Sequence, residues 1–344
     1  MTSETDPKGL DLAALHAWLT TAEPTLATGE LSASLITGGK SNLTYLVSDG
    51  ATEYVVRRPP LGHVLATAHD MSREYTVMAA LAPTDVPVPR MIAHCEDTEV
   101  IGAPFYVMAK VEGTPFSRSE QLEPLGADRT RAISEQLVDT LATLHAVDYE
   151  SVGLTEFGRP DGYLERQVSR WKKQLDASKS RELKGMDELI AQLDGSIPAA
   201  SDGTIVHGDY RLDNVLVDDS GTIAAVLDWE MSTLGDPLTD VAVLLAYQQL
   251  AEVAPPSAAG FGVTSASLAP GYLSYADVLE RYATKSGRDV SNISFHLSLA
   301  FFKLAVILEG IYFRHSAGQT VGTGFDGIGD MIVPLIAAGR AASH

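Results

Sequence analysis

The sequence predicts an α+β fold with two lobes, a small lobe built on an antiparallel sheet and a larger, mainly helical lobe. Two observations lead to this prediction. Short alternating runs of apolar and polar residues dominate the chain up to about residue 110, whereas helical spacing of apolar residues dominates the rest. A length of 344 residues also suits about two units. We therefore expect an N-terminal lobe at residues 1–110 and a C-terminal lobe at residues 111–344.

The small lobe is predicted to contain five strands, a leading helix and one inserted helix. The leading helix covers residues 10–22, where three leucines and Trp18 share one face. The strand-like runs lie at residues 31–36, 43–47, 54–57, 91–94 and 105–110, and the inserted helix at residues 70–81. The proline-rich segment 83–89 is predicted to be a loop.

The larger lobe is predicted to be built from long helices. These cover residues 127–146, 239–250, 275–286 and 291–316, with one or two more between 161 and 195. The most apolar stretch, residues 293–313, is interrupted by His296, Lys303 and Glu309. Three polar interruptions favour a buried core helix over a membrane span.

The charge balance limits the classes of partner. The formal net charge is −20, from 45 acidic and 25 basic residues. Such a chain is repelled by a nucleic-acid backbone and by an anionic membrane, so we expect neither as a partner. An anionic nucleotide would have to be attracted by a few local cations.

The cysteine content and the start of the chain favour one cellular compartment. The single cysteine, Cys95, excludes an intramolecular disulfide and is expected to be a small buried residue. The opening MTSETDPKGLD shows no basic region leading into an apolar one, so no secretory signal is predicted. We expect a cytoplasmic protein.

The segment 205–230, IVHGDYRLDNVLVDDSGTIAAVLDWE, carries the most informative pattern. Asn214 lies five positions after Asp209, and Asp228 lies fourteen after Asn214. Two short apolar runs on either side of the turn 218–221 predict a hairpin, which brings Asn214 and Asp228 side by side. A carboxylate that orients a hydroxyl, with an amide and a carboxylate for Mg²⁺, suits phosphoryl transfer.

At these residues the chain resembles the aminoglycoside phosphotransferase-like family of the protein-kinase-like fold. HGDYRLDN stands where protein kinases carry H-R-D-x-x-x-x-N, and LDWE stands where they carry D-F-G. The segments GGKSNLTY, DWEMSTLGDPLTD and FHLSLAFFKLAVILEGIYFRH look most like the subgroup of kinase-like domains fused to acyl-CoA dehydrogenases, which phosphorylate 4-hydroxyacyl chains. The resemblance implies a bilobal kinase-like fold with ATP and Mg²⁺ as cofactors.

The resemblance also implies a role for each residue of the segment. Asp209 would accept or orient the proton of the acceptor hydroxyl, while Asn214 and Asp228 would bind Mg²⁺. Arg211 matches a position where protein kinases carry Lys; it either neutralises the γ-phosphate or forms an ion pair on the loop. Asp240 would tie down the catalytic loop.

The segment ITGGKSNLTY of the small lobe, between two predicted strands, is a candidate loop to cover the phosphates of the nucleotide. Its glycines permit close backbone approach to phosphates, and its polar side chains supply donors. The segment is neither a G-x-G-x-x-G nor a Walker A sequence, and its alternative is a plain β-turn. The candidate nucleotide-binding residues here are Gly38, Gly39, Ser41 and Asn42.

The third predicted strand carries the cation that is expected to bind the phosphates. Protein kinases and many members of the family that this chain resembles have a Lys there, whereas this chain has Arg57. Alternation places Val55 and Arg57 on one face, so Val55 can pack on the base while Arg57 reaches the phosphates. Arg58 is the alternative if the register slips by one residue. Glu74, early on the next helix, is the expected partner of Arg57. Met108, in the segment linking the lobes, is a candidate to line the adenine site.

The function predicted is an ATP- and Mg²⁺-dependent phosphotransferase acting on a hydroxyl of a small molecule. The acceptor is either a hydroxyacid or hydroxyacyl compound or an aminoglycoside-like compound. A cationic acceptor requires an acidic pocket, whereas a carboxylate or CoA requires Arg or Lys. Candidates to meet an anion are Lys303, Arg314 and His315 on the last predicted helix, and the alternative is that all three cap and solvate that helix. The alternative is a pseudokinase that binds nucleotide or a partner without turnover, which Arg57 favours and the intact Asp209, Asn214 and Asp228 oppose.

Overall fold

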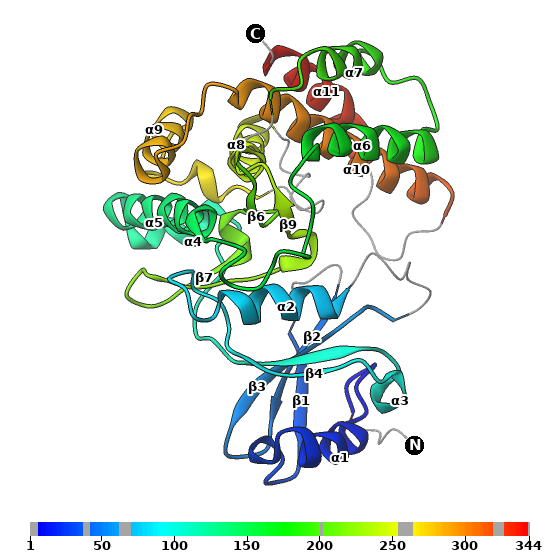
Figure 1. Cartoon of the computed structure of the whole chain (residues 1–344), viewed down its shortest axis with the longest axis vertical. Coiled ribbons are helices and arrows are strands. Elements are labelled where there is room, and N and C mark those ends of the chain that lie inside the picture. The colour runs from blue at the N-terminus through cyan, green and yellow to red at the C-terminus, as the bar shows by residue number, and fades with distance from the viewer. Residues whose placement is uncertain are drawn as a thin grey trace.

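The computed structural model of the chain has two lobes, one built around a sheet and one made mainly of helices (Figure 1). It describes residues 6–36, 42–61, 70–199, 202–253, 264–318 and 327–342. The N-terminal end lies beside the small lobe and the C-terminal end at the far side of the larger lobe. This arrangement confirms the predicted α+β bilobal fold.

The small lobe contains the five predicted strands in one antiparallel sheet of order β1-β2-β3-β5-β4. Asp11 caps the N-terminus of helix α1, because its side chain accepts a hydrogen bond from the Ala14 N–H. Asp70 caps the N-terminus of α2 in the same way. The elements are α1 (Leu12–Ala22), β1 (Ser32–Leu35), β2 (Leu43–Ser48), β3 (Glu53–Arg58), α2 (Met71–Leu81), β4 (Met91–Cys95), α3 (Thr98–Ile101) and β5 (Phe105–Ala109).

Alternation along the strands gives the small sheet two buried faces. One face packs against α1 through Tyr45, Val56 and Phe105, all fully buried. The opposite face carries Val55 and Tyr106 and joins the main core of the molecule under α2. In Figure 1, α2 lies between the sheet and the larger lobe. Residues of this second face therefore look toward the boundary between the lobes.

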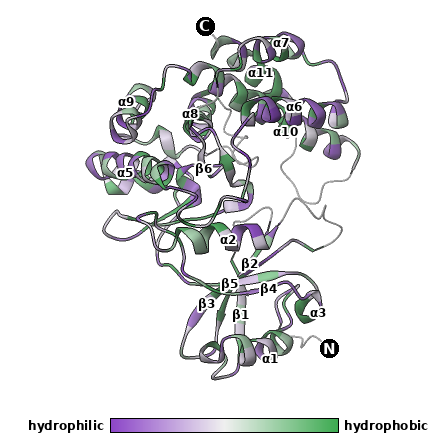
Figure 2. Cartoon of the chain, viewed as in Figure 1, coloured by the Kyte–Doolittle hydropathy of each residue, from purple (hydrophilic) through white to green (hydrophobic). Residues whose placement is uncertain are grey.

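The larger lobe consists of helices around two short two-stranded ribbons. Its helices are α4 (Ser119–Leu122), α5 (Ala127–Ala146), α6 (Tyr163–Ser178), α7 (Met186–Gly195), α8 (Leu238–Val253), α9 (Tyr275–Ser286), α10 (Ile293–Ser316) and α11 (Ile332–Ala342). Apolar and polar residues alternate along α5, while hydrophilic residues cover much of α6 (Figure 2). The predicted region 161–195 forms two helices, because the chain takes a left-handed turn at Gly185 before α7.

Helix α10 forms the centre of the larger lobe, as its apolar sequence predicts. It packs against α6, α8 and α11. Among the described helices it alone is long and apolar enough to cross a membrane, but 83% of its most apolar window is buried inside the protein. A core helix passes the same test of length and composition.

Two short ribbons support the catalytic segment. β6 (Thr204–Val206) pairs with β9 (Thr233–Gly235), and β7 (Val215–Val217) pairs with β8 (Ile223–Val226), which is the predicted hairpin. The first ribbon and α11 were not predicted. Three-residue strands are too short for a periodic signal, and α11 contains Pro334 and Gly339, which both disfavour helix.

Candidate active site

The β7–β8 hairpin brings the two ends of the catalytic segment together. Val215 pairs with Val226, and the Leu227 N–H donates to the Asn214 carbonyl at 2.8 Å. Asp228, which follows directly, therefore lies beside Asn214. The amide nitrogen of Asn214 donates to the backbone carbonyl of Asp209 at 2.8 Å and to its carboxylate at 3.1 Å. The structure thus gathers Asp209, Asn214 and Asp228 in one place.

Asp240, at the start of α8, holds the loop that carries Asp209. Its carboxylate accepts the N–H groups of His207 and Gly208, both at 2.7 Å, and the ring N–H of His145 at 3.2 Å. Burial acts to raise the pKa of Asp240, but the His145 hydrogen bond and charge, together with the backbone donor of Gly208, lower it below its ordinary value. A buried, ionised carboxylate therefore fixes the start of the catalytic loop.

Two backbone positions in the site have left-handed conformations. Gly208 has φ +86°, and a Cβ there would lie 2.7 Å from the Met231 carbonyl oxygen, so the loop needs glycine for close packing. Asp228 has φ 65° and is the single non-glycine residue with positive φ in the described part of the chain. Such conformations are costly and concentrate at functional sites.

Arg211 lies inside the catalytic loop and not at the surface. Its guanidinium is 3.0 Å from Asp213 and 3.6 Å from Asp209, and it stacks 4.3 Å from the ring centre of Tyr247. Burial raises the pKa of Asp213 to about 6 against the opposing effect of Arg211. The ion pairs of Arg211 are thus with carboxylates of the same loop, next to the predicted base, and its action on the γ-phosphate stays a prediction.

Arg57 connects the small lobe to Asp228, the predicted metal ligand. Its guanidinium lies 3.1 Å from the Glu74 carboxylate and also binds Oδ1 of Asp228. Glu74 is fully buried and accepts a hydrogen bond from the Tyr106 hydroxyl at 2.9 Å. The predicted pairing of Arg57 with Glu74 is thus present, and the contact with Asp228 is an addition that the sequence did not indicate.

The remaining small-lobe candidates lie around this pair. Val55 and Met108 are cross-strand partners on the same sheet face as Arg57, and both are buried. Arg58 points the other way and donates to the carbonyls of Gly9 and Ile101, so the one-residue slip does not occur. Asn42 donates its amide to Glu74 at 3.0 Å and to Glu230 at 3.2 Å. Gly38, Gly39 and Ser41 lie outside the described residues.

The polar atoms at the end of the hairpin suit Mg²⁺. The side chain of Asp228 is 28% exposed, and Asn214 uses its amide nitrogen on Asp209, which leaves the amide oxygen for coordination. Mg²⁺ prefers oxygen ligands and is usually held by one or two protein groups together with phosphates and water. Within the described residues no cluster of three or more His, Cys, Asp or Glu forms an all-protein cage. A nucleotide-bound Mg²⁺ does not require one.

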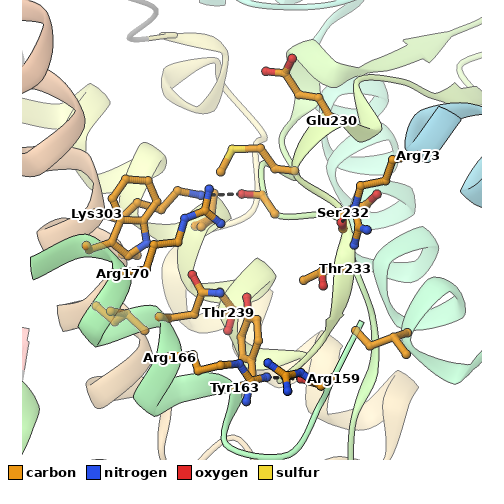
Figure 3. Close-up of a pocket in the computed structure, with 18 of the residues that line it drawn as sticks. Arg73, Arg159, Tyr163, Arg166, Arg170, Glu230, Ser232, Thr233, Thr239 and Lys303 are labelled. Atoms are coloured by element: carbon orange, nitrogen blue, oxygen red, sulfur yellow. Dashed lines mark hydrogen bonds between the residues drawn. The ribbon is translucent and has the colours of Figure 1, made fainter. Parts of the chain in front are cut away.

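A large cavity adjoins the catalytic loop at Gly208 (Figure 3). Its volume is about 590 Å³, and its walls come from α2, α6, α10 and the segment 230–234. Its charged lining residues are the cations Arg73, Arg159, Arg166, Arg170 and Lys303 and the acids Asp70 and Glu230. The sequence analysis named only Lys303 among these cations. The spacing of Arg166 and Arg170 by one helical turn next to Trp171 was the available signal.

Comparison with known proteins identifies the family. A family model described as the phosphotransferase enzyme family matches residues 32–276, which include both the small sheet and the catalytic segment. The chain belongs to this phosphotransferase family. The resemblance noted from HGDYRLDN and LDWE is thereby confirmed.

Relatives of this phosphotransferase include parts of larger proteins. Acyl-CoA dehydrogenase family member 11 of Gallus gallus is 36% identical over 327 residues, covering 93% of the chain and 41% of the relative. Acyl-CoA dehydrogenase family member 10 of Mus musculus is 35% identical over 311 residues, covering 89% of the chain and 28% of the relative. The chain therefore spans less than half the length of these relatives.

Solved structures agree with the family and fold. A candidate aminoglycoside phosphotransferase from Ralstonia eutropha superimposes with a TM-score of 0.83 at 34% identity, covering 97% of this chain and 98% of that one. A thermostable mutant of an aminoglycoside phosphotransferase, in a ternary complex with AMP-PNP and hygromycin B, gives a TM-score of 0.60 at 15% identity, covering 96% of this chain and 98% of that one. The second likeness is one of fold alone.

Proposed function

We propose that this phosphotransferase uses ATP and Mg²⁺ to phosphorylate a hydroxyl group of an anionic small molecule, a hydroxyacid or hydroxyacyl compound. The observation that carries the proposal is the meeting of Asp209, Asn214 and Asp228 beside a cavity with five cations. Phosphoryl transfer needs mainly positioning and charge stabilisation, and these groups can supply both.

Each residue has a task that follows from its position. Asp209 accepts or orients the proton of the acceptor hydroxyl, with Arg211 nearby to balance its charge. Asn214 and Asp228 hold Mg²⁺, which when bound neutralises charge on the phosphates. Arg57, fixed by Glu74, binds phosphate oxygens, and its planar fork suits two of them. Val55 and Met108 line the site of the base.

The charge of the cavity supports the anionic class of acceptor over the aminoglycoside-like class. Five cations face two acids there, although the whole chain carries −20. One acid, Asp70, caps α2, and the other, Glu230, accepts a hydrogen bond from the side-chain amide of Asn42, so the cations of the cavity outnumber its acids by five to two. A polycationic aminoglycoside would be repelled, whereas a carboxylate or a phosphate ester would be attracted. The relatives named as acyl-CoA dehydrogenase family members are consistent with an acyl acceptor.

The pseudokinase alternative draws on one observation. Arg57 binds Oδ1 of Asp228, so a metal ion would have to share that carboxylate with a guanidinium. A pseudokinase would bind nucleotide and release no phosphorylated product.

Mass spectrometry of products tests the proposal. Purified protein with MgATP is offered 4-hydroxybutyrate, 4-hydroxybutyryl-CoA, kanamycin and choline. We expect a product 80 Da heavier from at least one of the two hydroxyacyl compounds and none from kanamycin or choline. Phosphorylation of kanamycin alone would contradict the acceptor class. Mg²⁺-dependent ATP binding without any product from this panel would favour the pseudokinase.

A further inference from the structure

Two cations from different helices converge on one aromatic ring beside the catalytic loop. The Lys303 ammonium of α10 and the Arg170 guanidinium of α6 each lie 5.7 Å from the ring centre of Trp171. Both side chains line the large cavity, and Figure 3 shows them next to each other. Both charged groups are within cation–π range of the ring at the cavity wall.

No carboxylate pairs with these two cations in the described part of the chain, although other cations of the larger lobe have such partners. Lys172, on the same helix, binds Asp194 at 2.7 Å, and Arg281 binds Asp139 at 2.7 Å. Burial lowers the pKa of Lys303 below its ordinary value; the attraction of Asp209 and Asp240 opposes this shift, and the repulsion of Arg170 and Arg211 adds to it. The two cations thus lie together at the cavity wall with no carboxylate paired to either in the described residues, where one anionic ligand can contact both.

Lys303 is also bonded to the catalytic loop. Its ammonium donates to the Gly208 carbonyl at 2.7 Å, and Gly208 directly precedes Asp209. An ammonium group has three donors, and this is the single hydrogen bond that it makes to the described protein residues. Two donors remain for a ligand in the cavity. A ligand held there lies next to the backbone that positions the predicted base.

We propose that Lys303 and Arg170, supported by Trp171, form the anion-binding subsite for the acceptor and that Lys303 is its specificity-determining residue. This proposal rests on the proposed function and deepens it. The group recognised is a carboxylate or phosphate oxygen, which takes a point charge from Lys303 and a planar fork from Arg170. The bond from Lys303 to Gly208 then places the bound acceptor at a fixed position relative to Asp209.

The test measures binding of small anions, without requiring turnover. Tryptophan fluorescence and calorimetry follow 4-hydroxybutyrate, free CoA and the neutral 4-hydroxybutyramide, each added to protein with AMP-PNP and Mg²⁺. The variants are Lys303→Met, Lys303→Arg and Arg170→Gln. Lys173→Met is the matched control, because Lys173 is exposed on α6 and does not line the cavity. Arg170 is exposed, so its variant is expected to fold even if Lys303→Met does not.

The expected result is selective loss of anion binding. Lys303→Met should weaken binding of at least one anion by about ten- to a hundredfold, the size of a hydrogen bond to a charged group. Arg170→Gln should weaken binding of the same anion, and Lys303→Arg should keep its affinity within about threefold of the wild type. Lys173→Met should bind it with the wild-type affinity. Whether 4-hydroxybutyrate or CoA responds identifies a carboxylate or a phosphate as the group recognised. Binding of the amide should not change.

The subsite would be overturned if wild type, Lys303→Met and Arg170→Gln bound both anions with equal affinity. It would also be overturned if none of the three proteins bound either anion. Phosphoryl transfer is measured separately on the same proteins. If anion binding depends on Lys303 but no phosphoryl transfer occurs, the proposed function is contradicted and the proposed subsite is supported. Transfer with an unchanged KM for the acceptor in Lys303→Met would leave the function and remove the subsite.

Discussion

At the scale of single residues, Arg57 distinguishes this chain from kinases with Lys on the third strand. Strand alternation and the Glu on the next helix were enough to predict that Arg57, not Arg58, meets Glu74. The contact with Asp228 could not be predicted, because the two residues are 171 positions apart and meet only when the lobes pack. Local periodicity carries no information about such a contact.

Replacing Arg57 by Lys should change the dependence on Mg²⁺. A guanidinium can bind Glu74 and Asp228 at once, whereas an ammonium is a compact charge on a flexible stem. We expect Arg57→Lys to keep the bond to Glu74 and free Asp228 for metal. The Mg²⁺ concentration for half-maximal AMP-PNP binding should then fall by about three- to tenfold, as measured by calorimetry. Exposed Arg90, replaced by Lys, is the control, and an unchanged or higher requirement would contradict this role.

Removing the positive charge should instead destabilise the fold. Arg57→Met leaves Glu74 buried without its cation, and loss of one partner of a buried ion pair costs about 3–5 kcal/mol. The double variant Arg57→Met, Glu74→Gln should recover part of this loss, because the amide is neutral and can still bond Tyr106. Urea unfolding of the two variants measures the difference. Equal stabilities for the single and double variants would show that the pair contributes nothing.

At the scale of elements, the hairpin β7–β8 and the helices were predictable, while the β6–β9 ribbon was not. The turn residues 218–221 between two apolar runs specify the hairpin locally. The ribbon pairs three-residue strands about thirty positions apart, so only tertiary packing defines it. The tie between Asp240 and the loop was expected from family resemblance, and the contribution of His145 became visible only in the structure.

Asp240→Asn should make the free energy of unfolding less dependent on pH in the acid range. The pKa of Asp240 is lower in the folded chain than in the unfolded one, where it is about 4. Its stabilisation is therefore complete above about pH 4 and is lost as the pH falls through the lower folded value. The wild type should lose more unfolding free energy than Asp240→Asn between about pH 5 and pH 3, measured by urea titration. Parallel pH curves for the two proteins would refute the assignment.

Gly208→Ala should damage the loop without touching a charged group. A Cβ would lie 2.7 Å from the Met231 carbonyl, at a φ of +86° that favours glycine. We expect a loss of at least about 2 kcal/mol in stability and a fall in kcat larger than any change in the KM for ATP. Gly102→Ala is a suitable control for backbone strain alone, because its φ is +83° and its Cβ would meet nothing. A Gly208→Ala enzyme with normal kcat would contradict the close packing.

At the scale of the whole molecule, the lobes are joined by side chains that also serve the site. Arg57 reaches Asp228, Asn42 reaches Glu230, and Arg73 donates to the carbonyls of Ser232 and Phe157. The change of pattern near residue 110 predicted that two lobes exist, and the exact division remains a prediction. The large cavity could not be predicted, because its cations come from α2, α6, α10 and the loop before α6.

The measurement that tests the central claim most directly compares nucleotide binding and phosphoryl transfer in wild type, Asp209→Ala and Asp228→Ala. Both quantities are followed with and without Mg²⁺, with 4-hydroxybutyryl-CoA and 4-hydroxybutyrate as acceptors. We predict that Asp209→Ala binds MgATP like the wild type but transfers at least about a hundredfold more slowly. Asp228→Ala should lose the Mg²⁺-dependent part of binding as well. Wild-type turnover by Asp209→Ala would contradict the assignment of the catalytic loop.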